Sequence, residues 1–230
     1  MQYKMNLVDP AKAALLASNG WIDRSFEYRY NSAGFRCDEF DLRPSFLALG
    51  CSFTEGIGLP IEQAWPTLLG EQIGLYPWNL GVGGSSIMWC ARLIEPAILK
   101  VRPSVVALLV PPLMRVDVVD FLGLSNTYIA ENQSDLHSIG GVVLITSSYL
   151  KNWFAHHENA TLAQKQSMLY IESICQKYNV PLIVDFLENR KLAPMENQND
   201  LARDLMHLGK GHHTAIARMF QEQIVERKII

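Results

Sequence analysis

The sequence predicts an α/β fold in which a parallel sheet is covered by helices on both faces. Two observations support this class: short apolar runs of strand length alternate with longer amphipathic stretches, and glycine or proline punctuates the ends of the apolar runs. Parallel strands need long crossover connections, which helices supply. Ligands of such sheets bind outside the carboxyl ends of the strands, so the loops there are the first places to look for chemistry.

The individual elements follow from local pattern. Four apolar runs have the length and composition of buried strands: residues 45–49 (SFLAL), 75–80 (LYPWNL), 104–110 (SVVALLV) and 180–186 (VPLIVDF). Four stretches have helical spacing: residues 61–73, 86–100, 161–178 and 213–227. Ser85 or Ser86 is expected to cap the second of these helices, which runs to Lys100. The last helix has one apolar stripe, formed by Ile216, Met219, Phe220, Ile224 and Val225.

Two regions lie outside this alternation. Residues 1–44 are expected to form an N-terminal extension to a main domain of residues 45–230. Within the extension, residues 25–40 alternate aromatic and polar side chains around Asn31-Ser32-Ala33-Gly34, a pattern that predicts a small β-hairpin. Residues 113–148 are long for a connection and are expected to be a partly structured insertion near the site.

Composition and charge argue against several classes of binding partner. A chain of 230 residues with a net charge of −3 and no basic run offers no electrostatic reason to bind nucleic acid. The longest apolar run, residues 105–114, is too short to span a bilayer, so no membrane partner and a cytoplasmic location are expected. The four cysteines form no CxxC motif and are expected to be reduced, mostly buried thiols.

Three loops at predicted strand ends carry suggestive residues. Ser52 lies at the tip of the turn Gly50-Cys51-Ser52-Phe53-Thr54, a geometry that would aim its hydroxyl out of the sheet. The glycine-rich turn 79–85 (NLGVGGS) opens a helix whose backbone N–H groups can face an anion. Near the carboxyl terminus, the spacing of Asp204 and His207 lets a carboxylate orient an imidazole.

These residues resemble blocks I, II and V of the SGNH (GDSL-like) hydrolases, in the same order along the chain. The resemblance implies a three-layer α/β/α, flavodoxin-like fold and ester hydrolysis through an acyl-enzyme. It implies Ser52 as nucleophile, His207 as base and Asp204 as the residue that orients it. The N–H groups of Ser52 and Gly84 would form part of the oxyanion hole, and neither a metal nor an organic cofactor is expected.

One feature departs from the family. Its block III normally supplies an asparagine after the third strand, whereas this chain reads Leu109-Val110-Pro111-Pro112-Leu113-Met114-Arg115. Proline has no N–H that could substitute. The hole therefore has two backbone donors, or Arg115 or another residue reaches in; Asn79 and Arg36 are further candidates for substrate contact or support of the site.

Each interpretation has a simpler alternative. Ser52 could be a helix cap, and Asp204 and His207 a surface pair. His212 is a second choice as base, while His213 is expected to begin the last helix. A zinc site would need another ligand at suitable spacing, and the glycine turn lacks the dinucleotide and P-loop patterns.

The expected function is hydrolysis of a small acyl ester, for which a carbohydrate O-acetyl ester is one candidate. Acyl transfer by the same triad stays open, as does a non-catalytic binding module that keeps the fold. An α/β-hydrolase fits less well, because Thr54 stands where the second glycine of G-x-S-x-G would be. The oligomeric state has no readable signal.

Overall fold

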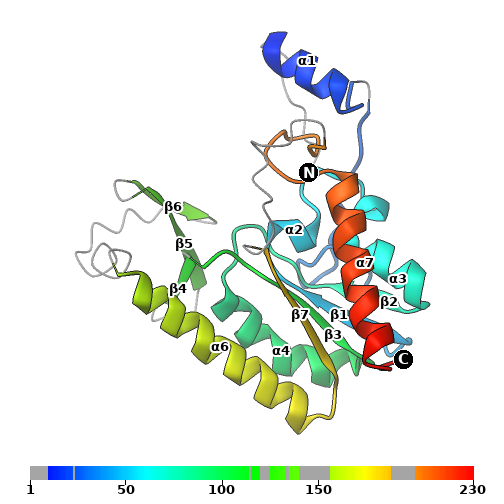
Figure 1. Ribbon diagram of the computed structural model, residues 1–230, viewed down its shortest axis with the longest axis vertical. Helices are drawn as coiled ribbons and strands as arrows, with labels where there is room; N and C mark the ends of the chain where they lie inside the picture. The colour runs from blue at the N-terminus through cyan, green and yellow to red at the C-terminus, as the bar shows by residue number, and fades with distance from the viewer. Residues whose placement is uncertain are drawn as a thin grey trace.

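The computed structural model describes residues 10–22, 24–113, 115–119, 125–132, 135–139, 156–187 and 200–230. In chain order the elements are α1 (Pro10–Ser18), β1 (Ser45–Leu49), α2 (Ser52–Glu55), the 3₁₀ turn η1 (Ile61–Gln63), α3 (Trp65–Ile73), β2 (Tyr76–Asn79), α4 (Ile87–Val101), β3 (Val106–Val110), β4 (Arg115–Val119), β5 (Ser125–Asn132), β6 (Asp135–Ile139), α6 (His157–Lys177), β7 (Leu182–Phe186) and α7 (Lys210–Glu226). Figure 1 shows their arrangement.

The four predicted strands form one parallel sheet in the order β2-β1-β3-β7. Ala48 of β1 pairs with Asn79 of β2 on one side and with Ala107 of β3 on the other. The strand order reverses direction between β1 and β3, as in flavodoxin-like folds, and this switch point is where such sheets bind ligands. The predicted fold class is confirmed.

Each face of the sheet packs against its own pair of helices (Figure 1). Alternate residues of β1 divide between the faces, as the two-residue period of a strand requires. Leu47 and Leu49 belong to the core beneath α4 and α6, and Phe46 and Ala48 to the core beneath α3 and α7. Because β1 is buried on both faces, its sequence is a continuous apolar run, which is why it could be predicted.

The helix boundaries differ in detail from the expected ones. Ser86 caps α4 as expected, since its Oγ accepts from the N–H groups of Met88 and Trp89. The predicted helix 61–73 is interrupted at Ala64, which has extended backbone angles. The last helix begins at Lys210, before the predicted start. Val225 was expected on its buried stripe, but its side chain is 67% exposed, so that assignment was wrong.

The predicted N-terminal hairpin was also wrong in form. Within residues 24–44 the structure contains a turn but no strand. Asn31 builds this turn itself: its Oδ1 accepts from the N–H groups of Ala33 and Phe35, at 3.1 and 2.9 Å. A side chain that satisfies the backbone locally replaces the inter-strand hydrogen bonds that a hairpin would need.

The insertion after β3 contains a three-stranded antiparallel sheet in the order β4-β5-β6. Hydrogen bonds join this insertion to the start of α4. The buried carboxylate of Asp117 accepts from Ser86 Oγ at 2.7 Å and from Arg92 Nη2 at 2.5 Å. The insertion is therefore anchored beside the glycine-rich turn that precedes α4.

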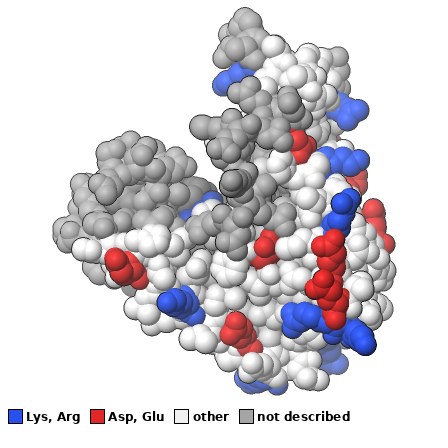
Figure 2. Space-filling view, in the orientation of Figure 1, with Lys and Arg blue, Asp and Glu red and all other residues white. Residues whose placement is uncertain are grey.

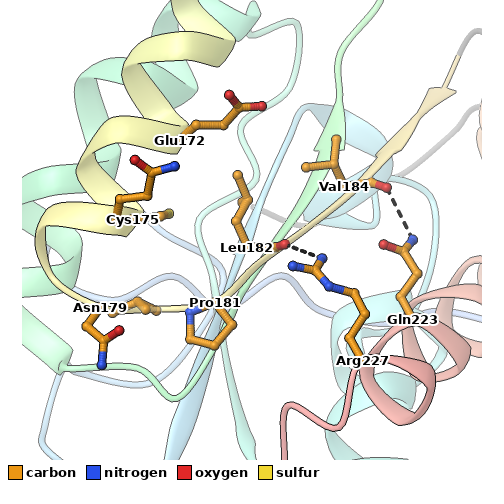
Figure 3. Close-up of a pocket in the computed structure, with 10 residues that line it drawn as sticks. Glu172, Cys175, Asn179, Pro181, Leu182, Val184, Gln223 and Arg227 are labelled. Carbon is orange, nitrogen blue, oxygen red and sulfur yellow. Dashed lines mark hydrogen bonds between the residues drawn. The ribbon is translucent and has the colours of Figure 1, made fainter.

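The β7 edge of the parallel sheet is covered by side chains of α7. Figure 3 shows Gln223 and Arg227 reaching the carbonyl oxygens of Val184 and Leu182, at 3.2 and 2.7 Å. These contacts occupy acceptors that another strand would use, a common protection of edge strands. A cavity of about 550 Å³ lies along this edge, between α6 and α7.

Charged side chains do not gather into a large patch on the described part of the face drawn in Figure 2, where acidic and basic groups lie next to each other along α7. All four cysteines are free, and Cys51, Cys90 and Cys175 are buried as expected. Among the described helices, none has both the length and the apolar character needed to cross a bilayer.

Candidate active site

Ser52 is the first residue of α2, directly after the carboxyl end of β1 and at the switch point of the sheet. The turn that leads to it depends on Gly50, whose φ of +153° disfavours other residues. A Cβ at this position would lie 2.1 Å from Thr54 Oγ1 and 2.8 Å from the carbonyl oxygen of Leu109. The Ser52 side chain is nearly buried and, within the described residues, its hydroxyl makes no hydrogen bond.

The glycine-rich turn after β2 packs against α2. Asn79 joins the two: its Nδ2 donates to the carbonyl oxygen of Thr54 at 2.9 Å. Gly81 is required at their contact, because a Cβ there would lie 2.3 Å from the backbone nitrogen of Glu55. Asn79 therefore supports this turn from a buried position.

Backbone N–H groups of this turn are almost all engaged. Four of them have acceptors: Gly81 donates to Asn79 Oδ1, Val82 to Gly50 O, Gly83 to Glu55 Oε2 and Ser85 to Val82 O. The N–H of Gly84 has no acceptor among the described residues. Gly84 also has a φ of +76°, a conformation that glycine adopts without strain. One amide of the turn is thus left available for a ligand.

Asp204 and His207 form a hydrogen-bonded pair. His207 Nδ1 lies 2.5 Å from Asp204 Oδ2, and Asp204 Oδ1 accepts from the N–H groups of Met206 and His207. Burial raises the pKa of Asp204, but the hydrogen bonds and charge of His207 outweigh it, so the pKa lies below its ordinary value. The carboxylate is therefore ionised at neutral pH.

The backbone forces this pair together. An isolated bridge between Leu201 and Leu208 closes the loop, and the Ala202 N–H donates to the His207 carbonyl at 2.9 Å. Leu205 has a φ of +59°, which is unusual for a residue with a branched side chain. Strained backbone of this kind persists where the surrounding structure enforces it, and it is frequent at functional sites.

The loop of Asp204 and His207 contacts the segment that follows Ser52. The Arg203 N–H donates to the carbonyl oxygen of Gly58 at 2.9 Å. The rings of Phe53 and His207 have their centroids 5.3 Å apart. Within the described residues there is no hydrogen bond between Ser52 and His207, and the contact of His207 is with Phe53, the neighbour of Ser52.

The three clustered histidines have three different environments. His212 pairs with Asp200, with Nδ1 and Oδ2 2.5 Å apart, and Asp200 also accepts from the N–H groups of Gly211 and His212. Asp200 thereby caps the first turn of α7, and this cap explains why the helix begins at Lys210, before the predicted start. The sequence pattern missed this second carboxylate–imidazole pair, because Asp200 lies far outside helical spacing from His212.

His213 is fully buried, and its Nδ1 accepts from the N–H of Trp65 at 3.0 Å. Burial lowers the pKa of His213 to about 3, so it is neutral in the folded protein at neutral pH. In the unfolded chain a histidine has a pKa near 6.5 and binds a proton more readily. Between these values the unfolded state holds more protons, so acidification favours unfolding.

We therefore expect the wild-type protein to lose stability below pH 6 faster than the His213→Gln variant. The difference in the free energy of unfolding should change by about 1 kcal/mol per pH unit between pH 6 and 4. Urea unfolding at three pH values measures it. Parallel pH dependences for the two proteins would contradict a neutral, buried His213.

Arg115, the candidate replacement for the missing asparagine, lies beside the glycine-rich turn. Its Nη1 donates to the carbonyl oxygen of Ser85 at 3.0 Å, one residue beyond the free amide of Gly84. Its Nε is buried and has no hydrogen-bond partner among the described residues. The guanidinium therefore brings an unused donor close to the turn.

Arg36 has a supporting position. It is only 1% exposed, and its guanidinium donates to the carbonyl oxygens of Glu55, Gly56 and Leu59, at 3.2, 2.6 and 2.7 Å. It also stacks over the ring of Tyr28, 4.2 Å from its centroid. Burial lowers the pKa of Arg36 below its ordinary value. These contacts fasten the N-terminal extension to the segment that follows Ser52.

Two cavities of the described residues lie elsewhere. The one in Figure 3 flanks the amino-terminal half of β7. Another of about 550 Å³ separates the N-terminal extension from α3 and β2, and Arg36 and Asn79 are among its lining residues. Neither cavity is lined by Ser52 or His207. The candidate site is therefore identified by the Asp204–His207 hydrogen bond and the Gly84 amide.

No protein-family model matches this chain, and no curated protein matches its sequence. Solved structures do show similarity. A psychrotrophic esterase, EstA, from Pseudoalteromonas sp. is 12% identical, with a TM-score of 0.40 over 79% of this chain and 97% of the esterase. A family 3 carbohydrate esterase from Clostridium thermocellum is 17% identical, with a TM-score of 0.40 over 80% and 96% of the two chains.

A lipase/acylhydrolase from Enterococcus faecalis is 12% identical, with a TM-score of 0.38 over 80% of this chain and 96% of the other. These likenesses concern the arrangement of strands and helices.

Proposed function

We propose that this protein is a serine ester hydrolase in which Ser52, His207 and Asp204 form the catalytic triad. The observation that carries the proposal is the N–H of Gly84, the one amide of the glycine-rich turn that has no acceptor among the described residues. Gly84 offers its N–H next to the turn that bears Ser52, while the neighbouring amides are engaged. An oxyanion hole needs such a preorganised donor beside the nucleophile.

In the proposed reaction, Ser52 Oγ attacks the ester carbonyl carbon while its proton passes to His207 Nε2. The carbonyl oxygen becomes an oxyanion, stabilised by the N–H groups of Ser52 and Gly84. The bond to the leaving alcohol then breaks, and that alcohol takes the proton from His207. Water repeats the sequence on the acyl-enzyme and releases the acid.

Asp204 holds the proton on His207 Nδ1 through its hydrogen bond, which leaves Nε2 as the acceptor that a general base needs. In the described structure the His207 ring instead contacts the ring of Phe53, the neighbour of Ser52. Catalytic hydrogen bonds commonly tighten only when substrate is present.

Arg115 is proposed to contribute the donor that the family takes from asparagine. Its buried Nε and its anchoring on the Ser85 carbonyl support this role. A cation near the developing oxyanion would stabilise it more strongly than a neutral amide. The substrate class proposed is a small acyl ester, with carbohydrate O-acetyl esters as the first to test.

Labelling with a fluorophosphonate tests the function directly, because the reagent reacts with activated serines. We expect a single adduct on the intact wild-type protein, seen by mass spectrometry, and none on the Ser52→Ala variant. Ser173→Ala serves as control, since that hydroxyl lies exposed on α6. A folded wild-type protein that takes no label would instead support the second candidate, a non-catalytic module, which the missing asparagine favours.

Acyl transfer is distinguished from hydrolysis by the products. If water is the natural acceptor, adding a sugar alcohol to the reaction leaves the yield of free acid unchanged. If the protein is a transferase, the acylated sugar accumulates and the yield of free acid falls.

A further inference from the structure

Glu55 is a buried carboxylate that the proposed chemistry does not use. It is the last residue of α2 and only 8% exposed. Its two oxygens have different partners: Oε2 accepts from the N–H of Gly83 at 2.6 Å, and Oε1 accepts from the hydroxyl of Tyr30 at 2.7 Å. Glu55 thus connects the glycine-rich turn to the N-terminal extension.

Gly83, which donates to Glu55, directly precedes Gly84, whose N–H has no acceptor among the described residues. Gly83 and Gly84 are consecutive glycines, whose backbone samples more conformations than that of any other residue pair. Without external contacts, the direction of the Gly84 N–H would therefore be poorly defined. The hydrogen bond from the Gly83 N–H to Glu55 fixes the Val82–Gly83 peptide unit, which directly precedes the unit that carries the Gly84 N–H.

The charge of Glu55 is compensated locally. A carboxylate near a developing oxyanion would oppose it unless other groups reduce its field. Tyr30 donates a hydrogen bond to the carboxylate, and the Arg36 guanidinium donates to the backbone oxygen of Glu55 itself. Both of these donors come from the N-terminal extension.

We propose that Glu55 is a positioning residue for the oxyanion-binding peptide at Gly83–Gly84, and that Tyr30 holds its carboxylate in place. This inference rests on the proposed esterase function. On this proposal the N-terminal extension contributes to the active site, because it supplies Tyr30, the residue that orients Glu55.

The test compares turnover per active site in four variants. Glu55→Ala removes both hydrogen bonds, whereas Glu55→Gln keeps them, since its Oε1 can accept from Gly83 and its Nε2 can donate to Tyr30. Tyr30→Phe removes the orienting hydroxyl alone. Glu62→Ala is the matched control, an exposed carboxylate in the neighbouring η1 turn.

Active sites are counted by fluorophosphonate titration, and kcat and KM are measured on a short-chain ester. We expect Glu55→Ala to lower kcat per titrated site by about 10–100-fold with KM within about twofold, less than the loss of a whole oxyanion donor. Glu55→Gln should stay within about threefold of wild type, Tyr30→Phe should lose about threefold to tenfold, and Glu62→Ala should be unchanged.

Two outcomes would overturn the inference: an unchanged kcat per titrated site in Glu55→Ala, or an equal loss in Glu55→Gln and Glu55→Ala. If Glu55→Ala does not fold, Tyr30→Phe decides, and a wild-type kcat in that variant overturns the inference. A wild-type protein that neither turns over ester nor takes label fails on the proposed function itself, a result separate from these.

Discussion

Replacing His207 with alanine is expected to lower kcat/KM for a short-chain ester by about 10³-fold or more, whereas His212→Ala should stay within about threefold of wild type. Both histidines are partly exposed and both pair with an aspartate at 2.5 Å. They differ in position: His207 packs on the ring of Phe53, the neighbour of Ser52, while His212 is held by Asp200 at the start of α7.

The two variants control for each other, because each removes an imidazole that pairs with a carboxylate at the same Nδ1–Oδ2 distance. Circular dichroism should show that both variants are folded. If His212→Ala were the inactive variant and His207→Ala the active one, the assignment of the base would be reversed. Asp204→Asn should lose about 10²–10⁴-fold, because the wrong tautomer of His207 would then be favoured.

Replacing Arg36 with alanine is expected to lower the free energy of unfolding by about 3–5 kcal/mol. Three carbonyl oxygens would lose a charged donor in a buried place, and a cavity would open where the guanidinium lies over the Tyr28 ring. The midpoint of urea unfolding measures the effect. Turnover should fall as well, since the same contacts support the segment that follows Ser52.

Arg29→Ala is the matched control for this prediction. Arg29 belongs to the same extension, but its side chain is 90% exposed and, among the described residues, its ion pair is a loose one with Glu27 at 3.9 Å. Its removal should change stability by less than about 0.5 kcal/mol. An Arg36→Ala protein as stable and as active as Arg29→Ala would show that the extension is only appended to the domain.

The parallel sheet could be predicted because its signal is local. Strands buried on both faces are apolar almost throughout, and β1 after Ser45 and all of β3 satisfy this, while helices of ordinary amphipathic pattern separate the strands. The cap at Ser86 was predictable for the same reason, since a capping serine needs only the amides two and three residues further along the chain.

Features that depend on distant residues could not be predicted from pattern. The early start of α7 comes from Asp200, whose carboxylate accepts from the N–H groups of Gly211 and His212. In the candidate site, the pairing of Asp204 and His207 is local and follows from their spacing. The role proposed for Glu55 had no sequence signal, because Tyr30, Glu55 and Gly83 meet only in the folded chain.

The central claim is that a hydroxyl on the first turn after β1 and an imidazole in the loop before α7 act on the same ester. A crystal structure of the protein inactivated by a fluorophosphonate tests it most directly. We predict phosphorus bonded to Ser52 Oγ, one phosphonyl oxygen within hydrogen-bond distance of the Gly84 N–H, and His207 Nε2 turned toward the Ser52 oxygen. An adduct on another residue, or His207 directed away from a phosphonylated Ser52, would contradict it.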